Sequence, residues 1–190
     1  GRCARFDVQK HRPRRFEHGL PPRRRQHRLG RSAGELRLDV LISDLLTPQT
    51  IIPDLKATSK KQALQEMASF AAERLGLEDR AILDVLLERE RLGSTGVGHG
   101  VAIPHGKMTD LDKLYVQFAR LSSPVDFDSP DGRPVDLMFL LLTPENAGGD
   151  HLTALAKASR LLRDEKVCTL LRGSDNAEAI YSAIMESEQV

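Results

Sequence analysis

The run Pro134–Thr143 is the feature of this sequence that most constrains the fold. Its central part, Leu137–Leu142, is uninterrupted apolar sequence, so a strand formed here would be apolar on both faces. Such a strand is typical of the centre of a sheet that other elements cover on both sides. The run is also far shorter than the roughly 20 apolar residues of a membrane-spanning helix. It therefore predicts a buried central strand and no membrane insertion.

Apolar spacing predicts the elements that surround this strand. Ser59 and Gln62 form a capping-box signature, after which apolar residues recur every three or four positions up to a stop at Gly76. We expect a short helix near Ile42 and further helices over 79–91, from a cap at Asp150 to Leu162, and from Asp175 onward. We expect strands over 51–55, 101–103 and 115–121. Strands that are separated by helices predict an α/β fold in which helices cover a sheet.

The first 34 residues differ in composition from the rest of the chain. They hold eleven basic side chains against two acidic ones, a net charge of +9, whereas the remainder carries a net charge of −8. Arginine runs, prolines and few apolar residues predict a disordered tail over residues 1–38, before one domain over residues 39–190. Such a tail could bind nucleic acid or direct the chain to an organelle. We favour a third interpretation, in which the tail is not part of the native protein and nucleic acid is not a partner.

The segment Gly93–Lys107 is unlike the rest of the chain and reads Gly-Ser-Thr-Gly-Val-Gly-His-Gly-Val-Ala-Ile-Pro-His-Gly-Lys. Its glycines leave backbone N–H groups accessible and permit positive φ, as a loop that holds an anion requires. Their spacing fits neither a Walker A loop nor a dinucleotide fingerprint. Pro104 restricts the orientation of His105, and Gly106 would leave one face of the histidine open to a partner. A lone histidine at a strand end is more often structural, so the pattern by itself leaves both interpretations open.

The sequence Gly-Val-Ala-Ile-Pro-His-Gly, preceded by Gly-Ser-Thr-Gly-Val-Gly, resembles the phosphorylation-site signature of the fructose/mannitol-type IIA domains of the bacterial phosphotransferase system. The similarity extends from about Val40 to about Ile184. The stretch Arg89–Gly96, and the lack of a fused membrane or IIB segment, most resemble the nitrogen-regulatory branch of this family. The resemblance implies an α/β fold with a single mixed β-sheet covered by helices, and neither a cofactor nor a metal.

The resemblance also implies the site residues. His105 matches the histidine that accepts the phosphoryl group, Arg89 matches an arginine that assists it, and His151 matches a second histidine nearby. Arg89 could instead be a solvated helix residue, and His151 could simply occupy the first turn of its helix. The loop that would cradle the phosphoryl group consists of Ser94, Thr95, Gly96, Gly98 and Gly100. His99 stands where the family more often has asparagine, and we expect it to be a surface residue.

The implied function is that of a phosphotransferase component. A histidine phosphocarrier protein would phosphorylate His105, and the chain would then regulate target proteins; passing the group to a sugar-specific IIB partner for fructose or mannitol uptake is the alternative. A metal site of His99, His105 and His151 is disfavoured, because their spacing matches no compact ligand pattern. Cys3 and Cys168 cannot form a disulfide framework, which favours the reducing cytoplasm.

Overall fold

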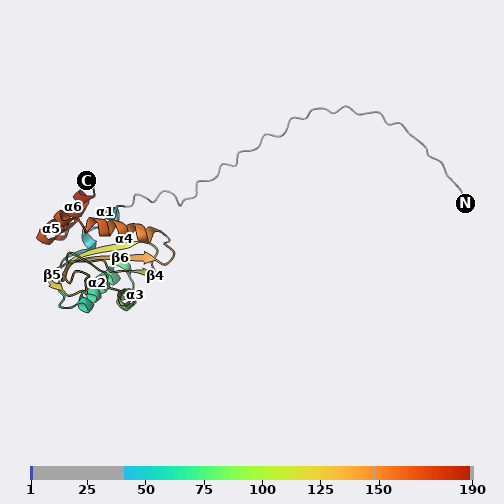
Figure 1. Ribbon diagram of the computed structural model, residues 1–190, viewed down its shortest axis with the longest axis horizontal. Coiled ribbons are helices and arrows are strands. Elements are labelled where there is room, and N and C mark those ends of the chain that lie inside the picture. The colour runs from blue at the N-terminus through green and yellow to red at the C-terminus, as the bar shows by residue number, and fades with distance from the viewer. Residues whose placement is uncertain (2–40, 148, 189–190) are drawn as a thin grey trace, which may run out of the picture. The chain divides into compact units, whose positions relative to one another are not determined.

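The computed structural model describes Gly1, residues 41–147 and residues 149–188 (Figure 1). Apart from Gly1, the tail predicted over residues 1–38 lies outside the described residues. The helices are α1 (Ile42–Leu45), α2 (Lys60–Leu75), α3 (Asp79–Arg91), α4 (Asp150–Leu161), α5 (Glu165–Gly173) and α6 (Ala177–Ser187), with a 3-10 turn η1 at Pro48–Thr50. The strands are β1 (Ile51–Leu55), β2 (Gly96–Gly98), β3 (Val101–Ala102), β4 (His105–Met108), β5 (Tyr115–Val125) and β6 (Val135–Pro144). None of the helices in this part of the chain has the length and apolar character of a membrane span.

The six strands of the described residues form one mixed sheet with β6 near its centre. β6 pairs antiparallel with β5 on one side and parallel with β3 and β4 on the other. β1 lies parallel outside β5, and β2 lies antiparallel outside β3. Every residue of β6 from Leu137 to Thr143 is buried. The predicted central strand and mixed sheet are therefore confirmed.

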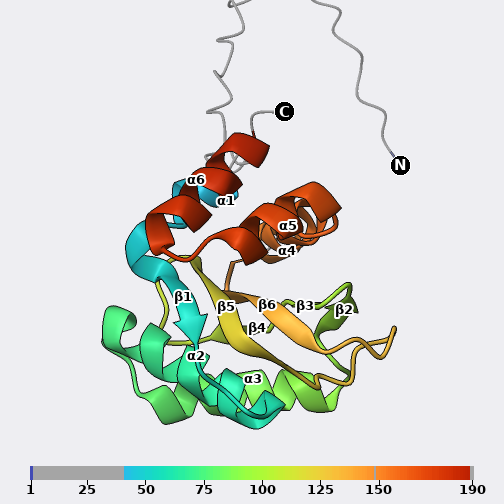
Figure 2. The same cartoon turned by 90° about the vertical axis from the view of Figure 1, so that its left-hand side faces the viewer.

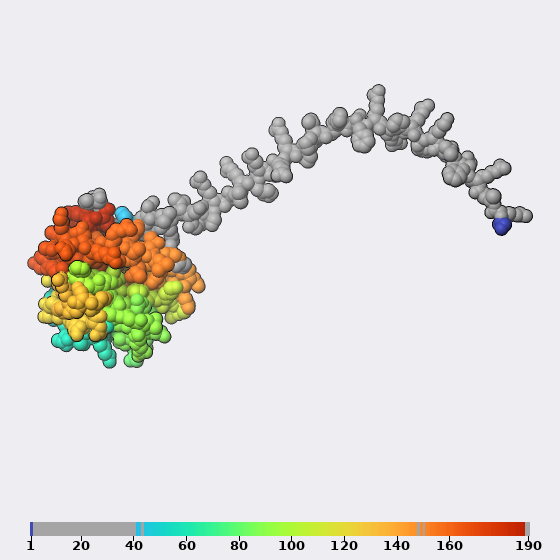
Figure 3. All heavy atoms as spheres, in the orientation of Figure 1, coloured from blue at the N-terminus to red at the C-terminus, as the bar shows by residue number. Residues whose placement is uncertain are grey.

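Helices cover both faces of this sheet, as the apolar character of β6 requires. Helices α2 and α3 lie on one face, and α1, α4, α5 and α6 lie on the other (Figure 2). Alternate side chains of β6 enter the two cores: Met138, Leu140 and Leu142 on the α2–α3 side, and Leu137, Phe139 and Leu141 on the other. The space-filling view shows the same order from outside, with the orange and red C-terminal helices on one side and the green helices on the other (Figure 3).

Two helix caps differ from those expected, and one helix was not expected. Helix α4 begins at Asp150 itself, with Gly149 in the N-cap position, so the cap predicted at Asp150 was wrong by one residue. Helix α6 begins after Asn176, whose side chain accepts a hydrogen bond from the backbone N–H of Ala179 at 2.9 Å and thus replaces Asp175 as the cap. Helix α5 was not predicted, although Asp164 caps it by accepting from two backbone N–H groups.

The path of the chain past Pro104 places His105. β3 and β4 lie one after the other along the same edge of β6, with Val101 opposite Leu137 and His105 opposite Leu141. Between them the carbonyl of Pro104 accepts the N–H of Leu141 at 3.0 Å, so the interruption still bonds to the sheet. No other described strand pairs with β4. His105 therefore lies at an edge of the sheet, between the two helical layers.

Candidate functional site

Arg89, His105 and His151 come from three elements and meet at this edge of the sheet. Arg89 lies in the last turn of α3, His105 is the first residue of β4, and His151 lies in the first turn of α4. The Nε of Arg89 lies 3.0 Å from Nε2 of His105. The rings of the two histidines have centroids 5.4 Å apart and are tilted by 50°. The structure thus brings together the three residues that the sequence singled out.

The contacts of His105 define which of its ring nitrogens carries the proton. Its Nδ1 lies 2.8 Å from the carbonyl oxygen of Ile103, and because a carbonyl only accepts, Nδ1 must be the protonated nitrogen. Nε2 then holds the lone pair and accepts the N–H of Arg89. The same guanidinium donates through Nη1 to the carbonyl of Gly93 at 3.0 Å. A neutral imidazole with its lone pair on Nε2 is a nucleophile, and here an arginine donates to that lone pair.

The ring of His151 is held by a residue that the sequence did not indicate. Thr143 of β6 is fully buried, and its Oγ1 lies 3.2 Å from Nδ1 of His151. The same hydroxyl lies 3.4 Å from the carbonyl oxygen of Gly106. Since Thr143 occupies Nδ1 of His151, Nε2 is the nitrogen of His151 that is left for a group bound at His105.

Both histidines are biased toward the neutral form. The pKa of His105 lies below its ordinary value, first because of burial and further because of Arg89, while the carbonyl of Ile103 and the carboxylate of Glu90 oppose this shift. The pKa of His151 is also lowered, by burial first and then by His105, Lys107 and Arg89. The site therefore combines positive charge from arginine with two uncharged rings, which suits the reception of an anion.

The first part of the glycine-rich loop is bonded away from the histidines. The N–H and hydroxyl of Thr95 donate to the carboxylate of Glu90, at 3.1 and 2.6 Å. The hydroxyl of Ser94 donates to the carbonyl of Phe127 at 2.6 Å and accepts the N–H of Gly96 at 3.1 Å. These bonds fix the loop and leave its predicted role in cradling a phosphoryl group as a prediction.

The remaining glycines flank His99 in the turn between β2 and β3. His99 has a positive φ of 56°, and its backbone N–H donates to Asp131 at 2.8 Å. Its carbonyl accepts from Arg172, which also pairs with Asp136. A Cβ on Gly100 would collide with this Arg172–Asp136 pair. The turn lies beyond the end of β3 away from His105, and along β6 the partners of Val101 and His105 are four residues, or about 13 Å, apart. The structure does not bring His99 into the histidine pair.

Gly106 has a different surrounding from the one that the sequence suggested. The residue is buried, and a Cβ at this position would overlap Cγ1 of Val85 on α3. It therefore allows β4 to approach α3 closely, which brings His105 within reach of Arg89. The expectation that Gly106 leaves a face of His105 open to a partner was wrong, because α3 occupies that space.

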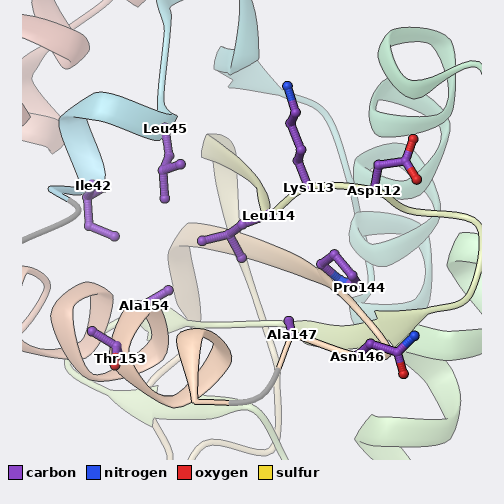
Figure 4. A pocket seen from close by; sticks show the side chains of 10 residues that line it. All are labelled: Ile42, Leu45, Asp112, Lys113, Leu114, Pro144, Asn146, Ala147, Thr153 and Ala154. Atoms are coloured by element: carbon purple, nitrogen blue, oxygen red, sulfur yellow. The ribbon is translucent and has the colours of Figure 1, made fainter. Parts of the chain in front are cut away.

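A hollow with other chemistry lies elsewhere on the described residues. It has a volume of about 590 Å³ and lies between α1, the segment before β5, the end of β6 and α4 (Figure 4). Ile42, Leu45, Leu114 and Ala154 give it an apolar floor. Neither histidine nor arginine lines it, so the volume of the hollow does not mark the reactive centre.

The sequence did not indicate Thr143 and Glu90, which bond to His151 and Thr95, or Lys60, which pairs with Glu90. Glu90 directly follows Arg89 and precedes Thr95 by five positions, so its proximity to the motif was a usable signal. Lys60 pairs with Glu90 at 2.6 Å from 30 positions away, and Thr143 comes from another strand. No spacing rule connects such distant residues.

Comparison with known proteins agrees with this geometry. Residues 44–187 match the family described as "Phosphoenolpyruvate-dependent sugar phosphotransferase system, EIIA 2". A nitrogen regulatory protein of Bradyrhizobium diazoefficiens is 59% identical over 143 residues, which cover 75% of this chain and 94% of the relative. The solved structure of the nitrogen regulatory protein IIA-Ntr from Neisseria meningitidis is similar with a TM-score of 0.72 and 36% identity, and the similarity covers 75% of this chain and 98% of that one.

The fold is shared more widely than the sequence. The crystal structure of the mannitol IIA protein from Escherichia coli is similar with a TM-score of 0.63 at 22% identity, over 73% of this chain and 98% of that one. The family match contains Arg89, His105 and His151, and it spans every described strand. On this match and on the identity to the nitrogen regulatory relatives, the chain belongs to the EIIA type-2 family of the phosphoenolpyruvate-dependent phosphotransferase system.

Proposed function

We propose that this chain accepts a phosphoryl group on Nε2 of His105 from a histidine phosphocarrier protein and acts as a regulator of the nitrogen-related branch of its family. The proposal rests on the two hydrogen bonds of the His105 ring, which leave the lone pair on Nε2. Its Nδ1–H is bound to the carbonyl of Ile103 and its lone pair on Nε2 faces Arg89. The relatives that are named nitrogen regulatory proteins support the regulatory role.

The transfer breaks one P–N bond and forms another. The lone pair on Nε2 of His105 attacks the phosphorus of the donor's phosphohistidine, and the donor's imidazole leaves with the electrons of its P–N bond. Arg89 then donates to the phosphoryl oxygens in place of Nε2. The carbonyl of Ile103 stabilises the positive charge that develops on the ring through Nδ1–H. No redox step is involved, and the chain's own residues supply positioning and charge.

His151 has a supporting role in this proposal. Its ring lies beside that of His105, and its Nδ1 is bound by Thr143. When Nε2 of His151 carries a proton, it can donate to a phosphoryl oxygen on His105. The negative charge that arrives with the phosphoryl group favours this protonation, against the effect of burial.

The surface around the site suits a protein donor. Leu92 follows the end of α3 and is 83% exposed, and Leu152 follows His151 and is 68% exposed. We propose that both side chains belong to the surface on which the donor docks. The net charge of −8 on residues 35–190 would attract a basic partner at a rate that falls with salt. A relay fed from phosphoenolpyruvate operates in the cytoplasm, which is the compartment that we propose.

The decisive experiment measures the intact mass of the protein after incubation with phosphoenolpyruvate, the upstream kinase and the phosphocarrier. We expect one phosphoryl adduct, lost in acid and stable in alkali, that is absent from His105→Ala. His99→Asn is the matched control, because it changes a histidine of the same segment that lies outside the pair, and it should retain the adduct. Absence of an adduct on the wild-type chain, with a donor that is shown to be active, would contradict the proposal. An adduct that persists in His105→Ala would move the acceptor to His151.

A second measurement separates regulation from sugar transport. The phosphorylated chain is mixed with IIB proteins for fructose and for mannitol, and the label on each protein is followed. We expect the group to remain on this chain or to return to the phosphocarrier. Rapid transfer to either IIB would instead assign the chain to sugar uptake.

A further inference from the structure

Lys60, Glu90 and Thr95 form a cluster next to His105, in which the carboxylate of Glu90 is buried and Lys60 is partly exposed. The side chain of Glu90 is 7% exposed and lies 2.6 Å from Nζ of Lys60. The other contacts of the carboxylate are the N–H and hydroxyl of Thr95. Lys60 is held further by the carboxylate of Asp128 at 3.0 Å, by the carbonyl of Phe127 at 3.2 Å and by the face of the Phe127 ring, 4.9 Å from its centroid. The cluster is thus fully bonded, and Lys60 neutralises a carboxylate that would otherwise be expensive to bury.

Two routes, each partly through the covalent backbone and partly through hydrogen bonds, lead from this cluster to the two ring nitrogens of His105. Glu90 follows Arg89 on α3, and Arg89 donates to Nε2. Thr95 accepts the N–H of Ile103 through its carbonyl at 2.9 Å, and the carbonyl of Ile103 accepts Nδ1–H. The bond between Glu90 and Thr95 closes these two routes into one ring of contacts around His105.

The glycine-rich loop after α3 does not need the Lys60–Glu90 ion pair to be held in place. Ser94 already ties the loop to Phe127 and to Gly96 through neutral hydrogen bonds. Buried ion pairs are in general a weak source of stability, because desolvation offsets the attraction between the charges. The Lys60–Glu90 pair instead fixes the orientation of Thr95. The carboxylate of Glu90 accepts from both the N–H and the hydroxyl of Thr95, and this leaves Thr95 one orientation.

We propose that Lys60, Glu90 and Thr95 form a positioning unit for His105, which holds Arg89 at Nε2 and Ile103 at Nδ1 and so selects the tautomer that attacks phosphorus. None of the three touches the reacting atoms. The inference rests on the proposed role of His105 as the phosphoryl acceptor. If the unit is loosened, the ring samples the other tautomer and other orientations, and small displacements of a nucleophile lower a transfer rate strongly.

Two sets of variants test the unit. In Glu90→Gln the amide can still accept from Thr95 through oxygen, but its NH₂ group then faces the ammonium of Lys60, and two donors meet. In Thr95→Val the hydroxyl is lost, whereas Thr95→Ser retains it along with the backbone bonds. The matched control is Glu88→Gln, which removes the same charge from an exposed position of the same helix.

The first readout is the tautomer of His105, taken from the nitrogen chemical shifts of its ring in the unphosphorylated protein. We expect Nδ1–H in the wild type, Thr95→Ser and Glu88→Gln, and a mixture of tautomers in Glu90→Gln and Thr95→Val. The second readout is the rate of phosphoryl acceptance. We expect it to fall by about tenfold or more in Glu90→Gln and Thr95→Val, and by less than about twofold in the other two.

The outcomes separate this inference from the proposed function. An unchanged tautomer and rate in a folded Glu90→Gln would overturn the positioning unit, as would a loss of stability without any change in tautomer. If Glu90→Gln does not fold, the comparison of Thr95→Val with Thr95→Ser decides by the same criteria. If the wild type accepts no phosphoryl group, the proposed function is wrong, whereas the tautomer comparison still reports whether the cluster orients His105.

Discussion

Gly106→Ala is expected to destabilise the protein through a single contact. Gly106 is buried in β4, and the added Cβ would overlap Cγ1 of Val85 on α3. Val85 is β-branched and therefore has one strongly preferred rotamer in a helix, so it cannot turn away. The overlap has to be relieved by moving α3 away from β4. Overpacking of this kind costs about 1–3 kcal/mol of the free energy of unfolding.

The same movement should impair the site. Arg89 lies one helical turn after Val85, so a shift of α3 lengthens the 3.0 Å contact between Arg89 and Nε2 of His105. Urea unfolding measures the loss of stability as a lower midpoint with an unchanged denaturant slope m. Mass spectrometry over time measures the rate of phosphoryl acceptance. Both should fall in Gly106→Ala.

A second substitution tests whether the named contact is the cause. Val85→Ala removes the methyl group that the new Cβ meets, so the double variant should recover most of the stability lost in Gly106→Ala and most of the rate. The coupling between the two substitutions should then be about 1 kcal/mol or more. If the two effects add within about 0.5 kcal/mol, the overlap is not what destabilises Gly106→Ala, and the reasoning is refuted.

Two further predictions concern the acceptor. Arg89→Lys keeps the positive charge, but a lysine cannot donate to both Nε2 of His105 and the carbonyl of Gly93 as the guanidinium does. We expect the initial rate of phosphoryl acceptance at saturating donor to fall by about tenfold. A rate equal to that of the wild type would show that charge alone suffices. Burial, and then Arg89, lower the pKa of His105 below its ordinary value of 6.5, so Nε2 stays unprotonated at pH 6.5 and above. The rate of phosphoryl acceptance should therefore be constant above pH 6.5 and fall only in more acid solution. A histidine titration by NMR with a midpoint at or above 6.5 would contradict this.

The central strand and the first long helix could be predicted from the sequence, because the apolar pattern is clearest in elements whose side chains are fully buried. β6 is apolar on both faces, and α2 has both a cap at Ser59 and a left-handed stop at Gly76, so their positions followed from local rules. Weaker elements escaped prediction. β2 and β4 are short and glycine-containing, and they are strands because β3 and β6 offer them partners. The caps predicted at Asp150 and Asp175 were each misplaced by one residue, because the neighbouring residues Gly149 and Asn176 also suit a cap position.

The site was predictable to the extent that it lies in one stretch of chain. His105 lies inside the motif of Gly93–Lys107, whereas Arg89 and His151 were indicated only by the resemblance. Thr143 and Lys60 carry no local signature, because a buried hydroxyl or ammonium is identified by its partner in space. The orientation of Thr95 toward Glu90 likewise depends on how α3 ends.

Because the site is divided between the two helical layers, its parts can be disturbed separately. Arg89 comes from α3 on one face of the sheet, His105 comes from the sheet edge itself, and His151 comes from the first turn of α4 on the other face. Fraying of that single turn would withdraw the second imidazole while leaving the nucleophile, its tautomer and its arginine in place. On the proposed function, a protein that binds over α4 would therefore change the contact between His151 and the phosphoryl group while leaving Arg89 and the tautomer of His105 in place.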